Sequence, residues 1–222
     1  MIQLNNYWIG IGDIHDDISQ LNRITELSRA NGLIINGDMT NLGHKDKAAI
    51  VINSISSINS NIYAQCGNMD YPDINDYLEE KGYCIHRQGK ELFKDIGIIG
   101  VGLSSPTPFN TPGEVPDEQL GKWLEETYQH VKHFNHVIVV THDPPYGTQL
   151  DKISGGGHVG SRAVLNFIHQ YQPDVCLCGH IHESRGKDVI GKTKIVNPGM
   201  FSNGGYALIT YEQGKLDIQL KE

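Results

Sequence analysis

The sequence lacks any apolar stretch long enough to cross a membrane. Its longest apolar runs, HVIVV at 136–140 and IGIIGVGL at 96–103, fall far short of the roughly 20 residues that a spanning helix needs. Near the N-terminus, no basic region precedes an apolar core, which argues against a secretory signal. We therefore expect a cytoplasmic protein that has no membrane partner.

Basic charge and cysteine are also scarce. The 222 residues hold 18 Lys and Arg against 26 Asp and Glu, for a net charge of −8. This balance argues against a nucleic-acid partner and against a nuclease, because backbone-binding proteins normally present a basic face. It does not exclude an enzyme acting on a phosphate ester, since bound metal ions reverse the local charge. Four cysteines form no disulfide framework in a chain this long, and we interpret Cys176 and Cys178 as small apolar residues of a buried strand.

No linker, charge block or internal repeat divides the chain, so we expect one domain over 1–222. Short apolar runs alternate with helical patterns, which indicates βαβ units with buried strands. Strands are expected at 7–11, 33–36, 62–66, 136–141 and 174–178, and helices at 17–30, 45–56, 74–81, 116–133 and 161–171. The segments 82–103 and 193–222 are typical of short antiparallel strands, the second with a hairpin about Gly214. The predicted fold is α/β, a four-layer α/β/β/α sandwich of two mixed β-sheets flanked by helices.

A polar cluster follows each of the five predicted strands. In open α/β folds, ligand groups collect at the carboxyl ends of strands. Two carboxylates, one amide and four imidazoles are expected there, namely Asp13, His15, Asp38, Asn68, His142, His180 and His182. This set suits two divalent cations such as Mn, Fe, Zn or Ni. A cation would also offset the several kcal/mol that unpaired buried charge costs at a strand end.

The spacing within two of these clusters has a physical use. In an extended segment alternate side chains point to the same side, so Asp13 should converge with His15, and His180 with His182. Taken alone, Asp38 is equally compatible with a turn or a helix N-cap. We interpret Asp16 and Asp17 as caps of the predicted helix 17–30 and leave them out of the metal site.

Five motifs occur in order along the chain: DIH at 13–15, GD at 37–38, GN at 67–68, TH at 141–142 and GHIH at 179–182. Each is common alone, but the ordered series clearly resembles the calcineurin-like metallophosphoesterase superfamily. The stretches SSPTPFNTPGE at 104–114, HDPPYGTQLD at 142–151 and GGGHVGSRAV at 155–164 look most like its Icc-related predicted phosphoesterases.

This resemblance implies a role for each residue. One metal would be held by Asp13, His15 and His182, the other by Asn68, His142 and His180, with Asp38 bridging both. The function implied is a binuclear metal-dependent phosphoesterase, a phosphatase or phosphodiesterase, in which a metal-bridging hydroxide attacks phosphorus in line. Its partner would be a small phosphate ester. The catalytic candidates are Asn68, Asp70 and His142, and Asn68 is also a substrate-binding candidate.

One position departs from the family pattern. The common third motif is G-N-H-D/E, whose His contacts phosphate, but Met69 stands there in this chain. Asp70 could then act as the acid, if burial raised its pKa, or only orient a ligand. Activated esters would suffer least from the missing acid.

Two further substrate-binding candidates lie in loops. His158 stands in a glycine-rich segment whose backbone N–H groups could bind a phosphate oxygen, and the alternative is a surface loop. Phe109 could stack on an aromatic group or nucleobase, or belong to a simple structural turn.

A different class of function is a non-catalytic metal-binding scaffold of the same fold that binds a protein partner. Loss of ligands would favour the scaffold, and none of the seven is lost. The substrate and self-association into a homo-oligomer stay open.

Overall fold

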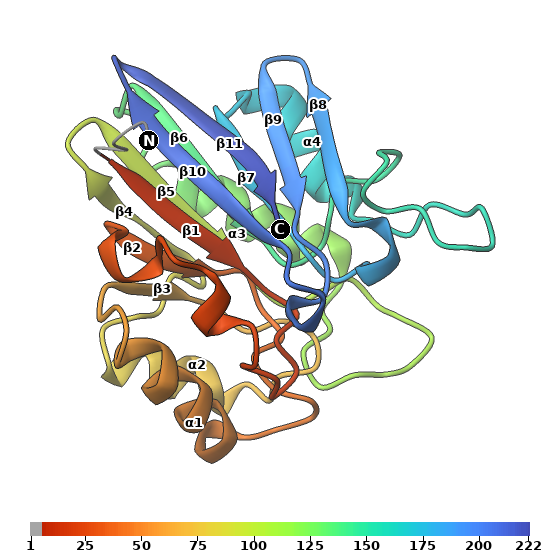
Figure 1. The fold of residues 1–222 in the computed structure, drawn as a ribbon. Coiled ribbons are helices and arrows are strands. Elements are labelled where there is room, and N and C mark those ends of the chain that lie inside the picture. Colours follow the sequence, from red (N-terminus) through yellow and green to blue (C-terminus); the bar gives the residue numbers. More distant parts are fainter. Residues whose placement is uncertain (1–5) are drawn as a thin grey trace.

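The computed structural model describes residues 6–222, which form two β-sheets flanked by helices (Figure 1). The strands are β1 (Tyr7–Ile11), β2 (Gly32–Ile35), β3 (Ile62–Ala64), β4 (Gln88–Phe93), β5 (Ile96–Val101), β6 (His136–Thr141), β7 (Val175–Leu177), β8 (Gly186–Ile190), β9 (Thr193–Asn197), β10 (Tyr206–Glu212) and β11 (Lys215–Lys221). The helices are α1 (Lys45–Ser56), α2 (Asp73–Glu80), α3 (Asp117–Tyr128) and α4 (Arg162–Tyr171). One sheet has the order β11-β10-β1-β2-β3 and the other β4-β5-β6-β7-β9-β8.

Three apolar layers hold these elements together. Trp8, Ile34 and Ile138 belong to the layer between the two sheets. The second layer joins the first sheet to α1 and α2, and the third joins the second sheet to α3 and α4. The predicted four-layer α/β/β/α sandwich of two mixed sheets is therefore confirmed.

Burial on both faces explains why the strands have continuous apolar sequences. In β1, Ile9 and Ile11 face the helical layer, whereas Trp8 faces the other sheet. Successive side chains of a strand point to opposite faces, so both faces of β1 must be apolar. Truncating Trp8 to Ala would cost about 3–5 kcal/mol on this account.

The predicted antiparallel segments are present. β4 pairs with β5, and β10 pairs with β11 in a hairpin that turns at Gln213 and Gly214, both in the left-handed region at φ 51° and 73°. Cys176 in β7 and Cys178 directly after it are buried thiols, as expected. Among residues 6–222, no helix has the length and apolar character required to cross a bilayer.

The prediction of a helix over 17–30 is wrong. The segment instead forms two short 3₁₀ turns, Leu21–Arg23 and Leu27–Arg29. Its hydrogen bonds run between residues three apart, for example from the N–H of Leu27 to the carbonyl of Ile24. The apolar residues recur every third position, a spacing that a 3₁₀ helix shares with one face of an α-helix, so this pattern does not distinguish the two.

Asp16 and Asp17 consequently cap no helix. The carboxylate of Asp17 accepts a hydrogen bond from the Ser19 N–H, and Asp16 accepts one from the Asn41 N–H. Of the other predicted helices, 45–56 has the bounds of α1, while α3 ends at Tyr128 instead of 133. The Ser161 side chain caps α4 by accepting from the Val164 N–H.

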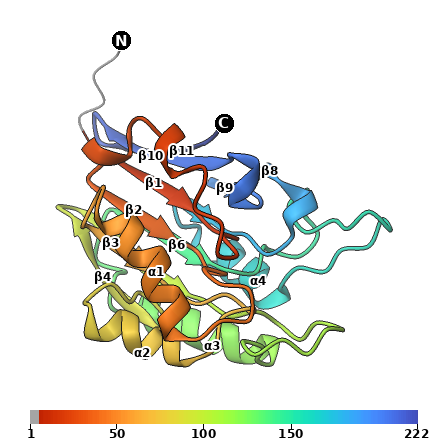
Figure 2. The ribbon, with the colours of Figure 1, turned by 60° about the horizontal axis from the view of Figure 1, so that its bottom comes forward.

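The strand order brings the predicted polar clusters together. β1, β2 and β3 are parallel to one another, as are β5, β6, β7 and β9. The carboxyl ends of β1, β2 and β3 in one sheet and of β6 and β7 in the other lead into loops on one side of the molecule (Figure 2).

Candidate metal centre

The loop after β1 is tied to the loop after β2 by backbone hydrogen bonds. The N–H groups of Ile14 and His15 both donate to the carbonyl of Asp38, at 2.8 and 3.0 Å, and that of Asp13 donates to Gly37. The two loops therefore share one rigid arrangement, which sets the relative positions of their side chains.

Unusual backbone conformations are concentrated in this region. Asp13, His15, Asp38 and His180 all have positive φ, between 48° and 68°. A non-glycine residue there costs about 1–3 kcal/mol, and such strain persists only where the surroundings enforce it, as at functional sites. The expectation that Asp13 and His15 converge through an extended segment is therefore wrong about the backbone, although the side chains do converge.

Four residues bring one ligand atom each into a first cluster: Asp13, His15, Asp38 and His182. The Nε2 atoms of His15 and His182 are 3.1 Å apart, and His182 Nε2 is 3.3 Å from Asp13 Oδ1. Ligands of one ion at metal–nitrogen distances near 2.1 Å lie about 3 Å from each other, so this spacing fits a single cation.

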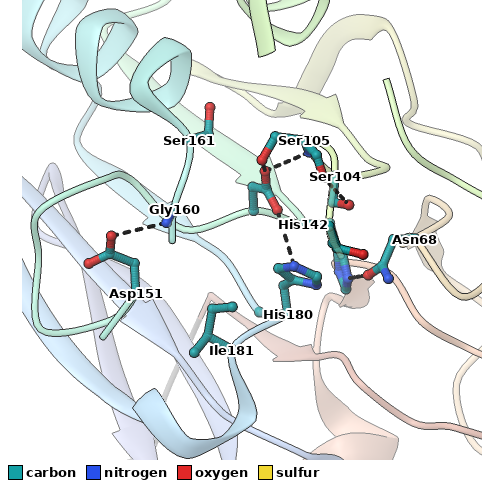
Figure 3. A network of polar contacts seen from close by, with 12 residues as sticks. Asn68, Ser104, Ser105, His142, Asp151, Gly160, Ser161, His180 and Ile181 are labelled. Atoms are coloured by element: carbon teal, nitrogen blue, oxygen red, sulfur yellow. Dashed lines mark hydrogen bonds and ion pairs between the residues drawn. The ribbon is translucent and has the colours of Figure 1, made fainter. Parts of the chain in front are cut away.

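Asp38, His142 and His180 form a second cluster. The Asp38 Oδ2 atom lies 3.3 Å from His142 Nε2 and 3.7 Å from His15 Nε2, so this one oxygen faces imidazoles of both clusters. Asn68 joins the second cluster through its Oδ1, which is 3.0 Å from His142 Nε2 (Figure 3). The structure thus brings together all seven residues that the sequence selected.

The electrostatics of the clusters are those of a site built for positive charge. Burial lowers the pKa of His15 and of His180, which leaves both imidazoles neutral, the form that binds metals. Burial opposes protonation of His142 too, yet the adjacent Asp38 carboxylate raises the pKa of His142. The Asp38 carboxylate thus favours positive charge at the point where the two clusters meet.

Two motif glycines permit the close approach of the loops. A Cβ on Gly67 would stand 2.1 Å from Asp38 Oδ1, and a Cβ on Gly37 would stand 2.5 Å from His142 Nδ1. A Cβ atom essentially never stands this close to a non-bonded heavy atom, so any larger residue at either position would have to displace its neighbours. The glycines of the GD and GN motifs thus have a packing role that the sequence analysis did not assign.

Asp70 is fully buried behind the two clusters. Its carboxylate accepts hydrogen bonds from the N–H groups of Met39, Thr40 and Gly67 and from the Thr40 hydroxyl. Burial and then the Asp38 charge raise the pKa of Asp70. With four donors on its two oxygens, this carboxylate holds the loops that carry Asp38 and Asn68.

Sequence reasoning missed Asp143, which directly follows His142. It is buried, accepts two hydrogen bonds from the N–H and hydroxyl of Ser105, and has its other oxygen 3.7 Å from His180 Nε2. Asn36 was also missed, and its side chain donates to the Cys178 carbonyl at 2.6 Å, linking the two sheets. The only available signal was position: each polar residue lies at or just after the end of a buried strand.

Phe109, but not His158, lines the same cavity as two residues of the clusters. Phe109 is 80% exposed and lines a cavity together with His180 and His182. His158 instead bonds Asp151 at 2.7 Å, and nearby backbone N–H groups are already engaged, that of Gly160 with Asp151 and that of Gly156 with Ile153. The structure therefore gives no observation in favour of phosphate binding at His158.

The protein is thus a two-sheet α/β protein that carries a candidate metal centre made of two neighbouring clusters of carboxylates and imidazoles. The family model of the calcineurin-like phosphoesterases matches residues 9–184, and the chain belongs to this family. Members typically bind divalent metals, and the clusters are groups that could hold them. An uncharacterized protein of Methanocaldococcus jannaschii is 34% identical over 196 residues, which cover 86% of each chain.

Solved structures share the fold at low identity. A Thermus thermophilus protein superposes with a TM-score of 0.73 at 17% identity, covering 98% of this chain and 99% of its own. A putative 5'-nucleotidase from Staphylococcus aureus gives 0.59 at 15% identity, covering 96% of this chain and 52% of its own. GAP50, described as the anchor in the inner membrane complex of Plasmodium, gives 0.66 at 14% identity, covering 98% and 84%.

Proposed function

We propose that the protein is a binuclear metal-dependent phosphoesterase that hydrolyses a phosphomonoester or phosphodiester. The observation that carries this proposal is the shared carboxylate: Asp38 is a member of both donor clusters, and its Oδ2 faces an imidazole of each. A carboxylate oxygen placed in this way is suited to bridge two cations.

The residues present fit such a pair of ions. Asp13, His15 and His182 would hold one cation, and His142, His180 and the Asn68 amide oxygen the other. The close His15–His182 nitrogen pair supports this assignment, because two imidazole nitrogens 3.1 Å apart share at most one proton and a cation satisfies both. Imidazole with carboxylate suits Mn, Fe, Zn or Ni.

When bound, such ions lower the pKa of coordinated water and neutralise phosphoryl oxygens. The protein residues supply the positioning. Asp70 holds the loops of Asp38 and Asn68, and Asp143 faces His180 from behind. Asn68 Nδ2 donates to Thr111 Oγ1, which directs its Oδ1 toward His142. No imidazole stands at position 69 to protonate a leaving group, so esters with good leaving groups are the favoured substrates.

Hydrolysis of p-nitrophenyl phosphate and of bis-p-nitrophenyl phosphate tests the proposal, with Mn, Fe, Co, Ni or Zn added in turn. Turnover that requires metal is expected. Asp38→Asn should bind both ions more weakly and lose at least about 100-fold in kcat/KM, whereas Asp46→Asn, on the exposed face of α1, serves as the control. An Asp38→Asn protein with wild-type turnover and metal content would refute the bridging role.

A protein-binding scaffold is the second candidate. The complete set of donors favours the enzyme, since a scaffold has no need to retain all seven. Retention of metal without turnover of either ester would favour the scaffold instead.

A further inference from the structure

A cavity of about 650 Å³ opens beside the candidate metal centre. Two of its lining residues, His180 and His182, belong to the donor clusters, one to each. The remaining lining residues come from two loops, at 105–109 and 153–159, and from Ile181 and Glu183 in the turn after β7. A group that extended from a phosphate at the metal centre would therefore enter this cavity.

The walls of the cavity are largely apolar. Phe109, Ile153 and Val159 are 80, 37 and 41% exposed, and they account for three of the seven large hydrophobic side chains exposed among residues 6–222. Exposed apolar side chains scattered singly need no explanation, but a group of them around one cavity marks a binding surface. Ile181, between the two candidate ligands His180 and His182, adds an apolar surface next to the metal centre (Figure 3).

Internal hydrogen bonds hold the first loop, 105–114, in place. Glu114 accepts from the Thr107 hydroxyl and from both the N–H and the hydroxyl of Thr111. Burial opposes ionisation, but these bonds lower the pKa of Glu114 to about 2, so the carboxylate is charged at neutral pH. Thr111 also accepts from Asn68, which links this loop directly to the donor clusters.

The second loop, 147–160, is organised around a buried carboxylate. Asp151 accepts from the N–H groups of Gly147, Thr148 and Gly160 and bonds His158. Both loops project from the same side of the molecule (Figures 1 and 2). The cavity between them is thus formed before a ligand binds, which lowers the entropic cost of binding.

The charges lining the cavity restrict its ligand. Within the described part of the chain, no lysine or arginine lines it, and the carboxylate of Glu183 accepts from the N–H and hydroxyl of Ser154. A second phosphate or a carboxylate on the substrate would find no counter-charge among these lining residues. An uncharged apolar group, in contrast, would lose only water on entering.

We propose that the cavity binds an apolar hydrocarbon or aromatic group of the substrate, so that the preferred substrates are phosphate esters carrying such a group. This inference rests on the proposed function, because it places the phosphate at the metal centre. The site selects substrates through Phe109, Ile153, Val159 and Ile181, and it discriminates against nucleoside polyphosphates and sugar bisphosphates.

The test uses alkyl p-nitrophenyl phosphate diesters with methyl, butyl and octyl arms and Mn²⁺-loaded protein. All three esters share one charge and one leaving group, so differences in kcat/KM report the arm alone. Each methylene that is buried fully should raise kcat/KM up to about fourfold, and we expect at least tenfold between methyl and octyl. A ratio near one, together with equal binding of octylphosphonate and methylphosphonate, which carry no p-nitrophenyl group, would overturn the proposal.

Matched variants locate the effect. Ile153→Ser and Val159→Ser should lower the octyl-to-methyl ratio severalfold. Ile50→Ser and Val189→Ser remove exposed side chains of the same types outside the cavity and should leave this ratio as in the wild type. A ratio that Ile153→Ser and Val159→Ser both leave unchanged would contradict the assignment of the cavity.

Measuring the binding of non-hydrolysable phosphonates shows whether the apolar cavity proposal has failed or the proposed phosphoesterase function has failed. Calorimetry with octylphosphonate and methylphosphonate, which cannot be hydrolysed as esters, reads the cavity without turnover. Tighter binding of octylphosphonate that Ile153→Ser weakens supports the cavity even if no ester is hydrolysed. Hydrolysis of all three diesters at equal rates, with equal binding of both phosphonates, would reject the cavity and retain the phosphoesterase.

Discussion

Replacing Asp70 by Asn tests whether this buried carboxylate holds the loops of the site or acts as the missing acid. Its two oxygens accept from four donors, Thr40 N–H and hydroxyl on Oδ1 and the N–H groups of Met39 and Gly67 on Oδ2. In its least costly orientation, the Asn amide would point its NH₂ at the Thr40 hydroxyl, which can rotate to accept. The Thr40 N–H is then left buried without an acceptor.

An unsatisfied buried N–H costs about 1–3 kcal/mol, so we expect Asp70→Asn to lower the free energy of unfolding by about 2 kcal/mol. Urea unfolding of the metal-free protein measures this quantity. Kinetics then distinguish the two roles. A holding role predicts the same proportional loss of kcat/KM with p-nitrophenyl and with alkyl phosphate esters, because the whole site is displaced. An acid role predicts a loss confined to the alkyl esters, whose leaving groups need a proton.

Thr40→Val provides a companion variant that leaves the Asp70 carboxylate in place, because it removes one donor to Asp70 and the acceptor of the Gly43 N–H. It should show a comparable loss of stability, and kcat/KM should fall by the same proportion for esters with good and with poor leaving groups. A change below about 0.5 kcal/mol in Asp70→Asn, together with a loss limited to poor leaving groups, would refute the holding role.

Three further predictions concern other positions. Burial, and then the Arg87 charge, lower the pKa of His86 to about 4. Between pH 6.5 and 4, His86 is therefore protonated in the unfolded chain but neutral in the folded one. Acidification over this range should lower the free energy of unfolding by about 2–3 kcal/mol. Urea unfolding at pH 7 and pH 4.5 should show a smaller loss in His86→Gln, and an equal loss in both proteins would disprove the assignment. Gly67→Ala should displace Asp38 and reduce the metal retained after gel filtration at least tenfold. Gly157→Ala is the control, because a Cβ there meets nothing nearer than 3.8 Å, and it should retain the metal. Equal retention in both variants would show that the loop can shift to accommodate the added Cβ without moving Asp38. Met69→His should raise kcat/KM for monoesters with poor leaving groups relative to p-nitrophenyl phosphate, and no gain would mean that the absent acid does not limit turnover.

The strands and the residues at their ends could be predicted from the sequence because both follow from local patterns. Continuous apolar runs mark strands that are buried on both faces, and β1 and β6 occupy the predicted residues. Polar residues directly after such runs lie at the carboxyl ends of the strands. Asp13, His142 and the other five candidates converge there because parallel strands end on the same side.

The remainder depends on tertiary contacts. The residues Leu21, Ile24 and Leu27 fit an α-helix or a 3₁₀ turn equally well, and the packing of the segment against the first sheet decides between them. Asp143 and Asp151 lie in loops without a periodic pattern, and their roles emerge only from the donors that surround them. The positive φ of Asp13 and His15 likewise follows from hydrogen bonds to a distant loop, which no local pattern announces.

The donor residues are divided between the two sheets. Asp13, His15, Asp38 and Asn68 follow strands of one sheet, whereas His142, His180 and His182 follow strands of the other. The site therefore lies across the interface between the two sheets, and its dimensions depend on how the sheets pack against each other. Side chains in the apolar layer between the sheets, such as Trp8 and Ile138, set the distance between them. A change in their volume would alter the gap between the ligand sets without touching a single ligand.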